Sequence, residues 1–253
     1  FTRSVKKCRI YINNLNINTL AKTVGIFGLS GEGKTTSTVV NPDGKYDFSK
    51  EGYKGMNPES HFIINCDRKE LPFPGNWWNT KAGNYASTVD YDSIIKCLDH
   101  CAKNDKIKSV AIDTLNSYLT FKEFNDRKKM TFDQWKDMAL DIVELINLCN
   151  TKLRPEQIAY LFGHVELITD VNGDEKKVLA TTGKKLKKIF PESLLPIVLF
   201  SKVEGGFDGD NTHYFETKAA KSTAKTPIGM FENFLIPNSL KLVDDTIRKY
   251  YSI

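Results

Sequence analysis

The segment Gly28–Thr35 constrains this chain more than any other feature, because it reads Gly-Leu-Ser-Gly-Glu-Gly-Lys-Thr. It matches the phosphate-binding loop pattern of a glycine, four residues and then Gly-Lys-Ser/Thr. The apolar run Val24–Phe27 before it favours a strand, and Lys34–Val40 after it favours the start of a helix. Because a strand before the loop and a helix after it are the context that the pattern requires, the segment predicts a nucleotide-binding α/β domain.

The residue types in this loop suit a triphosphate. Glycines let the backbone turn tightly and direct successive N–H groups at phosphate oxygens. Lys34 would lie along the β and γ phosphates as a fixed positive charge, and the Thr35 hydroxyl would coordinate Mg²⁺. The residues predicted to bind ATP are Gly28, Leu29, Ser30, Gly31, Glu32, Gly33, Lys34, Thr35 and Thr36.

Besides Thr35, a phosphate-binding loop needs an acidic residue from elsewhere in the chain to hold the metal, and Asp113 is the candidate. It ends the apolar run Lys108–Ile112, which favours a strand. Ligands bind at the carboxyl ends of strands in open α/β sheets. We therefore expect this strand to neighbour the loop's own strand, with Asp113 and Thr35 holding Mg²⁺. Alone, an aspartate after an apolar run is often only a strand-end cap.

Strand and helix signals alternate along the chain, which predicts a mostly parallel sheet with helices on both faces. The expected strands are Thr23–Phe27, Phe62–Cys66, Lys108–Ile112, Ile158–Gly163 and Ile197–Ser201. The expected helices are Tyr91–Ala102, capped by Ser87 or Asp90, and Thr131–Asn150. A glycine-rich turn between Ile197–Glu204 and Thr212–Thr217 predicts a C-terminal antiparallel hairpin, whereas Asn41–Ser60 and Thr169–Thr182 are typical of long loops.

Composition narrows the class of protein. The chain has 253 residues and a net charge of +5, so it permits an anionic partner without requiring one. No apolar run approaches the roughly 20 residues of a membrane-spanning helix, so no membrane association is expected. Five scattered cysteines argue against a disulfide framework and favour a reducing, cytoplasmic location.

Further segments in order along the chain resemble the phage-encoded RecA/RadA-like ATPases, the group that contains single-strand annealing ATPases of the Sak type. The resemblance runs from about Thr23 to Asp244. Besides Gly28–Thr36, it rests on Phe62–Asp67 with Leu71–Phe73, Ala111–Thr114, Phe162–Glu166, and Ala224–Pro227 leading to Phe231. The segment Asn41–Ser60 is longer than the family's usual connection.

This resemblance implies a RecA-like ATPase domain over residues 23–253 and an N-terminal extension over residues 1–22. It also implies ATP hydrolysis with Mg²⁺, a homo-oligomer (ring or filament) on single-stranded DNA, and a role in phage recombination through annealing or strand exchange. A single-strand DNA-binding protein is a further implied partner. The location would then be the host cytoplasm.

Asp67 and Glu166 compete as the group that activates water. Asp67 ends the strand Phe62–Cys66, which we expect to lie next to the loop's strand, where RecA-like enzymes carry a catalytic glutamate. Aspartate is one carbon shorter, and a strand-end aspartate paired with Arg68 or Lys69 explains it as well. Glu166 lies a few residues after the fourth strand.

The resemblance also implies roles for His164 and Lys225. RecA-like proteins place a polar residue at the position of His164 to sense the γ-phosphate, although a satisfied buried histidine is an equal alternative. Lys225 matches the basic group that reaches a neighbouring subunit's γ-phosphate, and exposed lysines are common without such a role.

In a RecA-like fold, Thr169–Thr182 and the basic run that follows would face DNA. The candidate DNA-binding residues in that run are Lys184, Lys185, Lys187 and Lys188. A solvated helix face explains these lysines equally well. Trp77 and Trp78 are candidates for stacking on bases or adenine, and core packing accounts for at least one of them more simply.

Two other functions remain open. A nucleotide-gated DNA-binding scaffold with little turnover would explain the short acid Asp67. A P-loop small-molecule kinase is compatible with Gly28–Thr35 alone. The six arginines of the chain do not cluster in sequence, which counts against the arginine-rich lid of such kinases.

Overall fold

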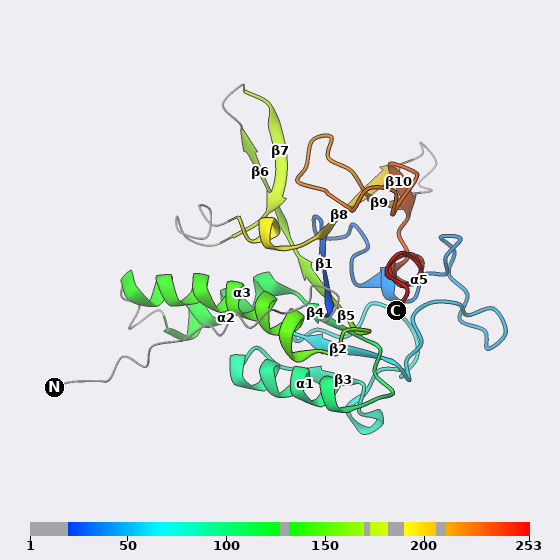
Figure 1. The fold of residues 1–253 in the computed structure, drawn as a ribbon, viewed down its shortest axis with the longest axis horizontal. Coiled ribbons are helices and arrows are strands. Elements are labelled where there is room, and N and C mark those ends of the chain that lie inside the picture. Colours follow the sequence, from blue (N-terminus) through cyan, green and yellow to red (C-terminus); the bar gives the residue numbers. More distant parts are fainter. Residues whose placement is uncertain (1–19, 127–131, 170–172, 182–189, 206–210) are drawn as a thin grey trace.

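The computed structural model describes residues 20–126, 132–169, 173–181, 190–205 and 211–253. Within these ranges, eight strands form one sheet in the order β10-β9-β8-β1-β5-β4-β2-β3, and β6 and β7 form a separate two-stranded ribbon (Figure 1). The strands are β1 (Lys22–Phe27), β2 (His61–Asn65), β3 (Tyr85–Ser87), β4 (Ser109–Asp113), β5 (Ile158–Gly163), β6 (Val165–Thr169), β7 (Glu175–Leu179), β8 (Ile197–Gly205), β9 (Asn211–Glu216) and β10 (Leu235–Pro237).

The sheet is mostly parallel. Strand β1 pairs in parallel with β5 and β8, and β4 pairs in parallel with β5 and β2. Strand β9 runs antiparallel between β8 and β10. The predicted fold class, a mostly parallel α/β sheet with a C-terminal antiparallel hairpin, is confirmed.

The prediction that β4 and β2 each lie next to β1 is wrong, however. Strand β5 lies between β1 and β4, and β2 is one strand further away. Every residue of Ile158–Gly163 is buried, as a strand covered on both faces requires. Parallel strands are joined by crossover connections, which can skip a position in the sheet, so closeness in sequence did not reveal the spatial order.

Helices cover both faces of the sheet. Helices α1 (Tyr91–Lys103), α2 (Leu115–Asp126) and α3 (Phe132–Lys152) pack on one face, and α5 (Leu240–Tyr251) packs on the other. Side chains of β4 point alternately to the two faces. Val110 and Ile112 join the apolar core beneath α1, α2 and α3, and Ala111 joins the core beneath α5. None of the helices in the described ranges is long and apolar enough to cross a membrane.

Local sequence explains where two of these helices begin. The side chain of Asp90 accepts a hydrogen bond from the backbone N–H of Ser93 at 2.9 Å and so caps α1, as one of the two predicted caps. Ser239 caps α5 in the same way, with its hydroxyl accepting from the N–H of Leu242 at 3.3 Å. Helices α2 and α5 were not predicted from the sequence.

Two segments differ from expectation. The helix predicted at Lys34–Val40 is only a 3₁₀ turn, η2, over Thr36–Thr38. Five of the seven residues from Lys34 to Val40 are β-branched, and the turn Asn41-Pro42 follows directly; both features disfavour a helix. The predicted loop Thr169–Thr182 contains β7, which pairs antiparallel with β6 and projects from the body of the protein as a ribbon (Figure 1).

A polar network fixes α5 to the centre of the sheet. The hydroxyl of the fully buried Tyr160 on β5 donates to Asp244 Oδ1 at 2.9 Å. Arg248 Nε donates to Asp244 Oδ2 at 2.6 Å. Because β5 ends beside the phosphate-binding loop, this network supports the region where a ligand would bind.

We expect Tyr160→Phe to lower the free energy of unfolding by about 1–2 kcal/mol, because it removes one buried hydrogen bond to a charged group. Urea denaturation measures the change. Tyr250→Phe is the matched control, since Tyr250 is 43% exposed and its hydroxyl bonds only a surface carbonyl. The control should change stability by less than about 0.5 kcal/mol. Equal effects of the two substitutions would contradict the assignment.

Candidate functional site

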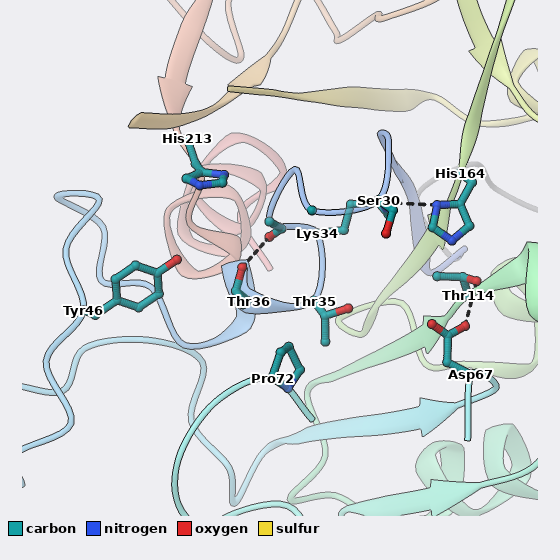
Figure 2. Close-up of a pocket in the computed structure, with 12 residues that line it drawn as sticks. Ser30, Lys34, Thr35, Thr36, Tyr46, Asp67, Pro72, Thr114, His164 and His213 are labelled. Carbon is teal, nitrogen blue, oxygen red and sulfur yellow. Dashed lines mark hydrogen bonds between the residues drawn. The ribbon is translucent and has the colours of Figure 1, made fainter. Parts of the chain in front are cut away.

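A cavity of about 360 Å³ opens at the carboxyl edge of the parallel strands (Figure 2). The phosphate-binding loop forms one wall, and the ends of β2, β4 and β5 lie beside it. The lining residues are Ser30, Gly31, Gly33, Lys34, Thr35, Thr36, Tyr46, Asp67, Pro72, Thr114, His164 and His213.

Glycines give the loop its curvature. Gly31 and Gly33 have φ values of 84° and 86°, in the left-handed region that disfavours other residues. A Cβ atom on Gly33 would also lie 3.0 Å from Nδ1 of His213. Glu32 accepts a hydrogen bond from the N–H of Leu29 at 2.7 Å, which closes the loop on itself.

Lys34 lies inside this loop with its charge turned toward carbonyl oxygens. Its Nζ donates to the carbonyl oxygens of Gly28 at 2.8 Å and Leu29 at 2.7 Å. Burial lowers the pKa of Lys34, and the carboxylate of Asp113 opposes that shift. A phosphate oxygen would be a stronger acceptor for this ammonium group than a neutral carbonyl oxygen.

Thr35 and Asp113 meet although 78 residues separate them. The Thr35 hydroxyl donates to Asp113 Oδ2 at 2.6 Å. The other carboxylate oxygen, Oδ1, is buried and has no hydrogen-bond partner among the described residues. A hydroxyl and a carboxylate with an unshared oxygen are the hard oxygen ligands that Mg²⁺ takes, so these two residues fit the predicted metal.

The electrostatics of Asp113 point the same way. Burial raises the pKa of Asp113 to about 7, while the hydrogen bond from Thr35 acts in the opposite direction. The buried carboxylate is therefore costly as a charge in the protein alone. A divalent cation beside it would favour the ionised form.

Asp67 reaches the same cavity from the end of β2. The backbone N–H groups of Cys66 and Asp67 both donate to the carbonyl oxygen of Asp113, at 2.6 and 3.3 Å, which holds the two strand ends together. The Asp67 carboxylate then accepts a hydrogen bond from the Thr114 hydroxyl at 3.0 Å and another from the Ser117 hydroxyl. Both bonds involve Oδ1, so this oxygen is oriented from two sides.

His164 stands on the other side of Lys34. Its Nδ1 lies 3.5 Å from Lys34 Nζ, and its backbone N–H donates to Asn116 Oδ1 at 2.6 Å. Burial lowers the pKa of His164, and the charge of Lys34 lowers it further. The ring is therefore neutral near pH 7 and lies beside the position expected for a terminal phosphate.

The remaining predicted residues lie elsewhere. Glu166, on β6, borders a separate small cavity and accepts a hydrogen bond from the N–H of Thr181 at 3.3 Å. Lys225 is exposed and donates to the carbonyl oxygen of Ser193 at 3.3 Å, outside the main cavity. The lysines predicted to bind DNA, Lys184, Lys185, Lys187 and Lys188, lie outside the described residues.

Several residues of the site escaped the sequence analysis. Asn116 and Ser117 are on α2, a helix with weak amphipathic character, although they follow the Asp113-Thr114 signal by only two to three residues. Tyr46 and His213 line the cavity from a long loop and from β9. No motif in the chain marks these two residues, because only the fold brings them to the cavity.

No family model matches the chain, and no curated protein matches it. A solved structure of a KaiC-like protein from the hyperthermophilic archaeon Pyrococcus horikoshii is similar, with a TM-score of 0.44 and 12% sequence identity over 85% of this chain and 88% of that one. So distant a likeness does not by itself assign an activity.

We expect Asp113→Asn to stabilise the protein in metal-free buffer at pH 8 by about 2–4 kcal/mol, because the amide removes a buried charge. The folded-state pKa of Asp113 is raised from 3.8 to about 7. The folded state of the wild type therefore loses stability as pH rises across that window and the buried carboxyl ionises. The gain should therefore be much smaller at pH 4. Urea denaturation at both pH values tests this, and equal gains would contradict the assigned ionisation.

Proposed function

We propose that this chain is a Mg²⁺-dependent ATPase of the RecA-like class that acts on single-stranded DNA in phage recombination. The hydrolytic part of the proposal is carried by one observation, the 2.6 Å contact between Thr35 and Asp113 beside Lys34. A loop for phosphates and an acid for the metal, from strands that are not neighbours, meet at one cavity. A glycine-rich turn that only connected a strand to a helix would not need a carboxylate from another strand beside its threonine.

Each residue then has a defined part in hydrolysis. Lys34 and the loop N–H groups would hold the β and γ phosphates and stabilise the charge that develops on them. Thr35 and Asp113 would hold Mg²⁺, and the ion would supply positive charge to offset that of the phosphates. Asp67, oriented through Oδ1, would orient water and accept its proton. His164 would donate to the terminal phosphate.

The same geometry favours hydrolysis over the alternatives. Asp67 lines the cavity and is oriented by two hydroxyls, as an active general base requires, which weakens the case for a scaffold without turnover. Among the described residues, no arginine lines the cavity. A kinase would need such groups to clamp a second phosphorylated substrate.

Support for single-stranded DNA as partner is of a different kind. The resemblance to phage RecA-like ATPases implies it, and the net charge of +5 is compatible with a polyanion. His164 directly follows strand β5, and strand β6 begins at the next residue. The β6–β7 ribbon projects away from the sheet. In this proposal the ribbon faces DNA, the assembly is a ring or filament, and Lys225 acts at a neighbouring subunit's nucleotide.

We expect Asp67→Asn to lower kcat for ATP hydrolysis by at least about 100-fold while leaving ATP affinity nearly unchanged, because the amide cannot accept a proton. Glu166→Gln is the matched control and should hydrolyse ATP at the wild-type rate. Steady-state hydrolysis assays and calorimetric ATP titrations measure the two quantities. Normal turnover by Asp67→Asn would exclude Asp67 as the base.

Adding single-stranded DNA should raise the ATPase rate severalfold at low salt, and the stimulation should fall steeply as salt increases. The measurement is an ATPase assay titrated with oligonucleotide, coupled to mass determination of the assembly. Absence of DNA binding at low salt would overturn the recombination role. DNA binding and annealing that survive in Lys34→Ala would instead make nucleotide ancillary and revive the scaffold.

A further inference from the structure

The cavity has two chemically different ends, separated by the phosphate-binding loop (Figure 2). Asp67, Thr114 and His164 lie together at one end. Tyr46 and His213 lie at the opposite end. The acidic and metal-holding groups fix where the reacting phosphate must be, so the rest of a nucleotide has to extend toward Tyr46 and His213.

Tyr46 offers an accessible aromatic face at that end. It is 51% exposed although it lines the cavity. Its ring stacks on Phe48 with centroids 6.3 Å apart and an interplanar angle of 21°. Phe48 in turn packs on Trp77 at 5.9 Å, and Trp77 packs on Tyr53 at 4.5 Å. The exposed ring therefore stands at the end of an anchored aromatic row.

The loop that carries Tyr46 is held in place by hydrogen bonds. The buried side chain of Asn41 donates to the carbonyl oxygen of Gly52 at 2.9 Å and accepts from the N–H of Lys54 at 2.6 Å. The N–H of Met56 donates to the carbonyl oxygen of Thr38 in η2 at 2.9 Å. These bonds fix the loop against the phosphate-binding loop, so the position of Tyr46 is built into the fold.

His213 completes this end of the cavity. It comes from β9, and its Nδ1 is buried without a hydrogen-bond partner among the described residues. That atom lies within 3.0 Å of the place where a Cβ of Gly33 would be, so it is close to the phosphate-binding loop. Because His213 also lines the cavity, its imidazole can bond a polar group of a ligand through a ring nitrogen, as a ribose hydroxyl would provide.

We propose that Tyr46 is the stacking platform for the base of a nucleoside triphosphate, with His213 as the polar contact to its sugar. This inference rests on the proposed function, since it assigns the nucleoside end of the same site. Base stacking on an aromatic ring contributes substantially to affinity and requires no particular hydrogen-bond pattern. The segment Asn41–Ser60 thereby acquires a role in ligand binding.

The test compares ATP with inorganic tripolyphosphate, which lacks base and sugar. Calorimetric titrations in Mg²⁺ should show Tyr46→Ala binding ATP about 10- to 100-fold more weakly than wild type, with tripolyphosphate affinity unchanged. Tyr46→Phe keeps the ring and should bind ATP like wild type. Tyr250→Ala, which removes a similarly exposed tyrosine on α5, is the control and should bind both ligands normally.

Three outcomes would overturn the platform. One is unchanged ATP affinity in Tyr46→Ala, and another is an equal loss of tripolyphosphate affinity, which would indicate damage to the phosphate-binding loop. The third is loss of binding to single-stranded oligonucleotide with ATP affinity intact, which would make Tyr46 a DNA contact. Failure of the wild type to bind either ligand would instead reject the nucleotide site itself, so the two failures are distinguishable.

Discussion

The contact between the Thr35 hydroxyl and the Asp113 carboxylate is the constraint on which the arrangement of the site depends. It joins a loop after β1 to the end of β4 across an intervening strand, so it exists only when three parallel strands are in register. Asp113 also accepts, through its backbone carbonyl, the N–H groups that hold the end of β2. Asp113 therefore positions both the proposed metal site and the candidate base.

A buried carboxylate whose pKa is raised to about 7 is a cost to the folded chain. Its unshared oxygen and the lowered pKa of the nearby Lys34 have the same origin, since burial has removed water from both groups. Buried groups whose pKa values are shifted in this way are common where a protein is arranged to bind a ligand rather than for its own stability. Nucleotide and Mg²⁺ would supply the missing charges.

The sequence predicted the core of this picture because its strongest signals are local. Gly28–Thr35 and the run ending at Asp113 carry their own chemistry, and the apolar strand Ile158–Gly163 has the bounds expected for it. Strand order was not predictable, since β5 enters between β1 and β4 through long crossovers. Tyr46 and His213 were missed for a related reason: their neighbours are distant in sequence and depend on how loops fold over the edge of the sheet.

The short turn η2 has a consequence for how an anion is retained. In proteins with a full helix after the loop, the aligned peptide dipoles of many residues attract phosphate. Here only Thr36–Thr38 follow, and the turn is instead supported by outside contacts, from Met56 to Thr38 and from the Ser239 hydroxyl to the carbonyl oxygen of Val40 at 2.8 Å. In the proposed ATP complex, retention of the triphosphate would therefore depend jointly on the segment Asn41–Ser60 and on α5, and a substitution that loosens either one would weaken it.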